Sequence, residues 1–154
     1  MALEFLHEDL EEIDAEPMTV VVYKASHLEE GVLVEDTSLD IEGVDVGIHV
    51  RWKLGELHEY VGRKAEWRTF LAYRKGGVVC VYEGTVNGTI VAPRGKEGFG
   101  FDPFFLPEHA DKTLAEAKPD EVNARAKAVE ALVESRPAAI VPPITDWEGP
   151  WQES

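Results

Sequence analysis

Residues 67–82 read WRTFLAYRKGGVVCVY, and this stretch decides the fold class. Two runs rich in β-branched and aromatic residues flank Gly76-Gly77, which is the pattern of two antiparallel strands joined by a tight turn. Residues 85–91 continue the β-rich pattern and extend the predicted sheet. Within that segment, Asn87-Gly88 is compatible with either a second tight turn or a bulge.

The segments before this hairpin predict two further strands and a helix. Met18–Tyr23 is an apolar, mostly β-branched run that predicts a buried strand. Gly31–Val34 predicts a short strand that ends in the acidic turn Glu35–Ser38. Between Val46 and Val61, apolar residues recur at steps of three and four, which is the spacing of a helix.

The segments after the hairpin predict a helix and an irregular tail. Thr113 and Glu116 have the spacing of a capping box and predict a short helical turn. Pro119 can begin a helix that continues to about Ser135. Its expected buried stripe consists of Val122, Ala126, Val129 and Val133. With an irregular tail over about residues 136–154, the sequence predicts a single α/β domain across residues 1–154, built on a mixed twisted sheet with flanking helices.

The composition excludes several classes of function. The chain has 154 residues, of which 44% are apolar, so one globular domain of ordinary size is expected. Its net charge of −15 would repel nucleic-acid polymers and anionic membranes, so neither is expected as a partner. The single cysteine, Cys80, excludes a disulfide framework and is expected in the core. Because no apolar run approaches the roughly 20 residues of a membrane span, we expect a cytoplasmic protein.

Two segments outside the hairpin carry candidate chemistry. Glu35-Asp36 follows an apolar strand, where α/β sheets commonly place their ligands. Carboxylates there suit Mg²⁺ or the activation of water, although the pair taken alone favours a solvated turn. Lys24 follows the predicted strand Met18–Tyr23, and it is either a phosphate ligand or a surface lysine.

Residues 93–103 read PRGKEGFGFDP and form the third candidate. The segment combines cations for phosphate, aromatic rings for stacking on a base, and the Asp102 carboxylate for polar groups. This mixture suits a nucleotide, although glycine-rich segments are also common in hairpin connections.

Taken in order, these segments resemble the inosine triphosphate pyrophosphatase (ITPase) family, over about Leu10–Leu132. The residues that carry the resemblance are VEDTSL at 34–39, Gly88-x-Ile90, PRGxxGFGFDP at 93–103 and KTxAE at 112–116. The resemblance implies an α/β fold, a homodimer and a requirement for Mg²⁺. It also implies a nucleoside triphosphate substrate, with inosine, deoxyinosine and xanthosine triphosphates hydrolysed to the monophosphate and pyrophosphate.

The same resemblance implies roles for individual residues. The implied catalytic residues are Asp36, Glu35 and Lys24, with Asp36 binding metal or activating water and Lys24 meeting the phosphates. The implied metal ligands are Glu12 and Asp36. The implied substrate-binding residues are Arg51, Phe99, Gly100, Asp102 and Lys127, with Phe99 stacking on the base.

The chain departs from the family pattern at two places. The domain is expected to lack the family's N-terminal phosphate-binding strand and loop. In the C-terminal helix, Val122 replaces a lysine, and Ala126-Lys127-Ala128 replaces Ser-His-Arg. Lys127 is the candidate to contact a keto oxygen of the base in their place, and an apolar helix face could instead pack on another subunit.

Two hypotheses about function follow from the sequence. The leading one is a Mg²⁺-dependent pyrophosphatase acting on non-standard purine nucleoside triphosphates. The alternative is a catalytically degenerate homologue that binds a nucleotide or regulates a partner. An unrelated structural domain explains the ordered motifs poorly.

Overall fold

A computed structural model of the chain describes residues 4–5, 13, 15–43, 54–95 and 100–151. Within these ranges, six strands form one sheet in the order β1-β2-β3-β4-β5, and β6 also pairs with β4. The strands are β1 (Glu4–Phe5), β2 (Val32–Ile41), β3 (Lys64–Lys75), β4 (Val78–Ile90), β5 (Phe105–Pro107) and β6 (Ala139–Val141). Because β1 runs parallel to β2 while the other pairs are antiparallel, the predicted mixed sheet is confirmed.

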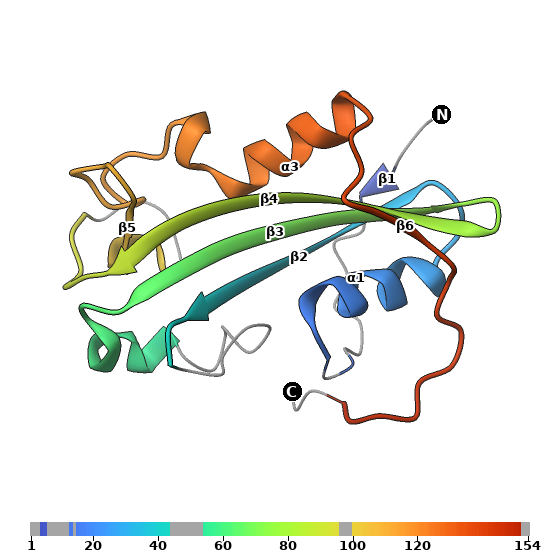
Figure 1. The fold of residues 1–154 in the computed structure, drawn as a ribbon, viewed down its shortest axis with the longest axis horizontal. Coiled ribbons are helices and arrows are strands. Elements are labelled where there is room, and N and C mark those ends of the chain that lie inside the picture. Colours follow the sequence, from blue (N-terminus) through green and yellow to red (C-terminus); the bar gives the residue numbers. More distant parts are fainter. Residues whose placement is uncertain (1–3, 6–12, 14, 44–53, 96–99, 152–154) are drawn as a thin grey trace.

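Among the described residues, two α-helices cover opposite faces of this sheet (Figure 1). The helices are α1 (Pro17–Ser26) and α3 (Ala124–Val133), with the 3₁₀ helices η2 (Leu54–Tyr60), η3 (Asp102–Phe104) and η4 (Asp120–Val122). Side chains alternate along a strand, so Phe70 of β3 packs under α1 while the adjacent Leu71 packs under α3. We call these the α1 face and the α3 face of the sheet.

The central hairpin is confirmed and is longer than expected. Lys75 pairs with Val78 across the Gly76-Gly77 turn, and Gly76 has a φ of 62°. Strand β4 then continues without interruption to Ile90. Asn87-Gly88 forms neither a turn nor a bulge, because both residues keep their regular pairing with β3.

Helix α1 corrects the strand predicted for Met18–Tyr23. Pro17 begins the helix, a position that proline favours. Val20, Val21 and Val22 have modest helix propensity, but all three are buried, together with Ala25 one turn further on. Burial against β2, β3 and β4 therefore outweighs the local preference of these valines for a strand.

Strand β2 corrects the short strand and acidic turn predicted for Gly31–Ser38. The strand runs from Val32 to Ile41, and residues 34–41 pair with β3. Leu39 and Ile41, beyond the acidic residues, are buried in the core. The acidic residues therefore lie within a strand and not at its end.

Helix α3 confirms the predicted C-terminal helix but buries a different side. Ala124, Ala128 and Ala131 are buried, whereas Val129 is 42% exposed and Val133 is 77% exposed. The helix packs closely over β4 at Gly84, and only small side chains fit in that space. The predicted stripe was therefore wrong at Val129 and Val133, because the close approach of α3 to β4 leaves room only for alanines, whereas Val122 does pack against the core. Cys80 is buried under the same helix, as predicted.

The remaining segments differ from expectation in detail. Thr113 and Glu116 form the predicted capping contact, with Thr113 N–H donating to Glu116 Oε1 at 2.9 Å, but the turn does not continue as a helix. The tail is largely irregular, although β6 adds three paired residues. Of the helix predicted over residues 46–61, the structure describes only η2; the rest lies outside the described residues.

Candidate functional site

Asp36 and Lys24 lie together on the α1 face of the sheet. Asp36 projects from β2, and Lys24 comes from the last turn of α1. The Lys24 Nζ lies 3.5 Å from the Asp36 Oδ1, and the two side chains are only 11% and 13% exposed. Partial exclusion of water strengthens the attraction between such groups. The structure therefore places a carboxylate and an ammonium, both predicted from the sequence, in one contact.

Glu35 projects to the opposite face of the sheet. Neighbouring residues of a strand point to opposite sides, so Glu35 lies on the α3 face. Its Oε2 lies 2.9 Å from the Nε of Arg125, in the first turn of α3. The acidic pair of the sequence is thus divided between two ion pairs, one on each face.

The two acidic residues flank the outer edge of β2. Strand β1 pairs with β2 only at Val32 and Leu33. From Val34 onward, no strand of the described ranges pairs with that edge. An edge of this kind presents backbone N–H and C=O groups, so a ligand crossing it could reach side chains on both faces.

Asp102 lies next to Lys118, a residue that the sequence did not single out, and Lys118 lies over Trp67 of β3. Asp102 begins η3 with its side chain only 5% exposed, and its Oδ2 lies 2.6 Å from the Nζ of Lys118. The Lys118 Nζ also lies 5.6 Å from the centroid of the Trp67 ring, while Gly100 is exposed. In the sequence, the only sign of Lys118 was its place two residues after Glu116 of the capping box.

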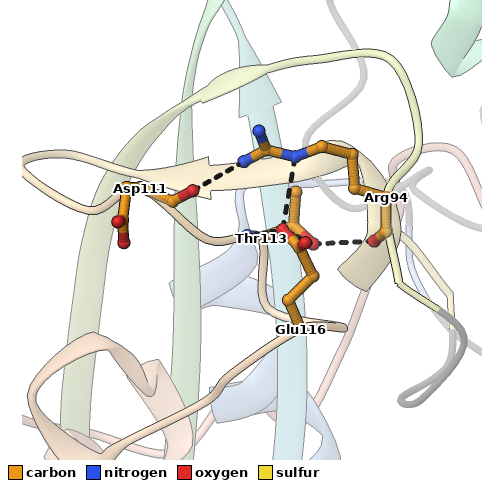
Figure 2. A network of polar contacts seen from close by, with 4 residues as sticks. All are labelled: Arg94, Asp111, Thr113 and Glu116. Atoms are coloured by element: carbon orange, nitrogen blue, oxygen red, sulfur yellow. Dashed lines mark hydrogen bonds and ion pairs between the residues drawn. The ribbon is translucent and has the colours of Figure 1, made fainter.

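A network of polar contacts joins Arg94 to the turn that precedes Lys118 (Figure 2). Thr113 Oγ1 donates to the Arg94 carbonyl oxygen at 2.8 Å, and the Arg94 Nε lies 3.2 Å from the Glu116 Oε1. The Arg94 guanidinium also donates to the Asp111 carbonyl oxygen at 3.0 Å. Arg94 is in addition tied to the start of η3, because its N–H donates to the Pro103 carbonyl oxygen. These contacts fix the turn at Thr113–Glu116, which precedes Lys118, relative to the segment carrying Asp102.

This network predicts the effect of removing one hydroxyl group. We expect Thr113→Val to lower the free energy of unfolding by about 1 kcal/mol, because Thr113 is fully buried and its bond to Arg94 is lost. Urea denaturation measures the change. Thr85→Val is the matched control, because the half-buried Thr85 hydroxyl donates to the Glu83 carboxylate two residues away and does not join separate segments by that bond. Equal losses in the two variants would contradict a special role for the network.

The other candidate residues are only partly placed. Lys127 is half-buried on α3, with its Cβ close to Gly84 of β4. Glu12, Arg51 and Phe99 lie outside the described residues. In the part of the chain that is described, no group of three or more His, Cys, Asp or Glu side chains could hold a metal ion. The described helices also include none that is long and apolar enough to cross a membrane.

The fold and these contacts define an α/β protein with ion-paired carboxylates on both faces of a mixed sheet. The Ham1 family model matches residues 2–135, and the chain belongs to this family. The resemblance to the ITPase family drawn from the sequence is thereby confirmed.

Individual relatives are moderately similar to the chain. It is 37% identical over 108 residues to a dITP/XTP pyrophosphatase of Hyperthermus butylicus, covering 62% of this chain and 57% of that protein. It is 36% identical over 130 residues to a dITP/XTP pyrophosphatase of Methanopyrus kandleri, covering 73% and 68%. It is 35% identical over 145 residues to an inosine triphosphate pyrophosphatase of Yarrowia lipolytica, covering 80% and 77%.

A solved structure has a similar fold. The crystal structure of a nucleoside-triphosphatase, also described as a dITP/XTP pyrophosphatase, from Mycobacterium abscessus superposes with a TM-score of 0.58 at 26% identity. The match covers 83% of this chain and 82% of that one. The predicted α/β fold is thus confirmed by a related structure.

Proposed function

We propose that this protein is a Mg²⁺-dependent pyrophosphatase that hydrolyses non-standard purine nucleoside triphosphates, such as ITP, dITP and XTP, to the monophosphate and pyrophosphate. The observation that carries the proposal is the Lys24–Asp36 contact, beside the edge of β2 that no strand of the described residues pairs with beyond Leu33. The proposal draws its substrate class from the relatives, which are named dITP/XTP or inosine triphosphate pyrophosphatases.

The charge of the protein requires local cations for such a substrate. With a net charge of −15, the molecule as a whole repels a triphosphate. Lys24 supplies a positive charge on the α1 face, and Arg125 supplies one on the α3 face. In this proposal Asp36, which lies beside Lys24, accepts a proton from the attacking water. No covalent intermediate is required in this scheme.

The Asp36 carboxylate on the α1 face is the type of ligand that suits Mg²⁺ as a partner of the substrate. Proteins often bind this ion through one or two carboxylates plus substrate phosphates. Asp36 provides one carboxylate, and in the described ranges no larger cluster of ligands surrounds it. Asp36, with Glu12 as the second proposed ligand, would therefore hold the ion. When bound, Mg²⁺ supplies charge neutralisation and polarises a phosphoryl oxygen.

One observation favours the second candidate function, a homologue that binds nucleotides without turnover. The adjacent residues Glu35 and Asp36 point to opposite faces of the sheet, and Glu35 already forms an ion pair with Arg125. Only Asp36 of the two then remains on the face that carries Lys24. The homodimer implied by the family resemblance stays a prediction under either function.

A pyrophosphate-release assay separates the two functions. With Mg²⁺ present, we expect release from ITP, dITP and XTP at rates well above that from ATP, and loss of release when the metal is removed by chelation. The measurement is a coupled assay of pyrophosphate, with binding of the same nucleotides followed by calorimetry. Binding without release from any of these nucleotides would reject the pyrophosphatase and support the non-catalytic homologue.

A further inference from the structure

The C-terminal segment, residues 136–151, runs from the sheet past helix α1, and we call it the C-terminal strap (Figure 1). It follows the part of the chain that the family model matches, which ends at residue 135. Strand β6 of the strap pairs with residues 79–81 of β4, and the Ala138 N–H donates to the Val81 carbonyl oxygen at 2.7 Å. The strap is therefore joined to the sheet before it reaches α1.

The first contact of the strap with α1 is at Ser26, the last residue of the helix. The Ile144 N–H donates to the Ser26 Oγ at 2.8 Å, and the Ser26 hydroxyl donates to the Val22 carbonyl oxygen at 2.6 Å. The Ile144 side chain packs against the core cluster that contains Val22 and Ala25. One hydroxyl group therefore links the strap to the backbone of the helix.

The second contact is at Trp151, near the end of the described chain. The edge of its ring meets the Tyr23 ring, with 5.7 Å between centroids and an angle of 84° between planes. Trp151 also forms a backbone bridge with Ile13, which is fully buried. Because Tyr23 and Ser26 lie on either side of Lys24 in the chain, the strap contacts α1 both before and after the lysine of the candidate site.

Helix α1 depends on tertiary packing for its position. It has 10 residues, whereas isolated helices shorter than about 12–15 residues are marginal in water. Its N-cap residue, Glu16, makes no side-chain capping hydrogen bond, and three consecutive valines lower its intrinsic helix propensity. The contacts of the strap therefore help to hold the helix, and with it the Lys24 Nζ at 3.5 Å from the Asp36 Oδ1.

From these contacts we infer that the C-terminal strap positions Lys24 for the phosphates of the substrate, with Ser26 and Trp151 as the positioning residues. The inference rests on the proposed function, in which Lys24 supplies the positive charge on the α1 face. Both residues act through the helix and not on the substrate. A misplacement of about 1 Å by a distant substitution can cost about a hundredfold in rate, so the placement of α1 is important.

A double-mutant cycle on the binding of a non-hydrolysable triphosphate tests this inference without requiring turnover. The probe is the α,β-imido analogue of ITP with Mg²⁺, and calorimetry measures its affinity. We expect Trp151→Ala to weaken binding about tenfold, which is within the range of coupling between neighbouring residues. In a Lys24→Met background, the same substitution changes the affinity by less than about twofold, because the group that the strap positions is absent.

Three other substitutions distinguish positioning from a general loss of stability. Trp151→Phe keeps an aromatic edge against Tyr23 and retains the affinity. Ser26→Ala removes the acceptor of the Ile144 N–H and weakens binding as Trp151→Ala does. Ile140→Ala is the matched control, because the Ile140 side chain of β6 is 59% exposed, and it leaves the affinity unchanged. Circular dichroism shows that each variant is folded.

Three results would overturn the inference. The first is that the unchanged chain does not bind the analogue. The second is that folded Trp151→Ala or Ser26→Ala binds it as tightly as the unchanged chain. The third is that Trp151→Ala weakens binding equally with and without Lys24.

The outcome is separable from that of the proposed function. If Trp151→Ala and Lys24→Met are coupled in binding but no pyrophosphate is released, the positioning role of the strap stands and the pyrophosphatase fails. If pyrophosphate is released while the two substitutions act independently, the pyrophosphatase stands and the positioning role fails.

Discussion

The Asp36→Asn variant releases pyrophosphate about a hundred- to ten-thousandfold more slowly than the unchanged chain, which is the usual contribution of a general base. Asparagine has nearly the same shape as aspartate but cannot accept the proton of the attacking water. It also loses the charge that holds Lys24 at 3.5 Å. Initial rates with saturating ITP and Mg²⁺ measure the effect, and the unfolding free energy of the variant shows that the fold is retained.

Two further variants test whether the loss of activity is specific to the carboxylate on the α1 face. Glu30→Gln is the matched control, because Glu30 is a 56% exposed carboxylate in an ion pair with Arg74 near the hairpin. It is expected to leave the rate unchanged. Glu35→Gln is expected to reduce the rate less than Asp36→Asn, because Glu35 projects to the opposite face. An Asp36→Asn variant with an unchanged rate would remove Asp36 from the proposed mechanism.

The second large effect is expected at Gly84, where helix α3 crosses β4. A Cβ at this position would overlap the Ala124 carbonyl oxygen and would lie 2.5 Å from the Ala128 backbone nitrogen. Both atoms belong to the helix backbone, so a side-chain rotation cannot relieve the overlap. We expect Gly84→Ala to lower the free energy of unfolding by about 3 kcal/mol, at the upper end of the cost of overpacking a core. Urea denaturation followed by circular dichroism measures the loss.

Gly77→Ala provides the control for this substitution. A Cβ at Gly77, in the turn between β3 and β4, meets no atom within 4 Å. Alanine there is expected to leave stability unchanged or to raise it slightly, because it restricts the unfolded chain. Similar losses at the two glycines would show that α3 does not pack on β4 as closely as the structure indicates.

The sequence was most informative where local pattern and tertiary environment agree. Gly76-Gly77 between two β-rich runs predicted the central hairpin, because a tight turn needs only local residues. The sequence was misleading for Met18–Tyr23, because β-branched residues favour a strand in isolation but this segment is helical. Burial of Val20 and Val21 against the sheet stabilises a helix there. The local sequence does not predict this, because the sheet surface on which the helix packs is formed by distant segments.

At the candidate site, too, some features follow from the sequence and others only from the tertiary structure. The sequence by itself determined the family, the mixed α/β class and the residue types that could meet a phosphate or a base. Only the tertiary structure decided that Asp36 contacts Lys24 while Glu35 contacts Arg125, and that Lys118 contacts Asp102. The physical reason is that strand alternation and helix packing assign each side chain to a face, and those faces exist only after distant segments have assembled.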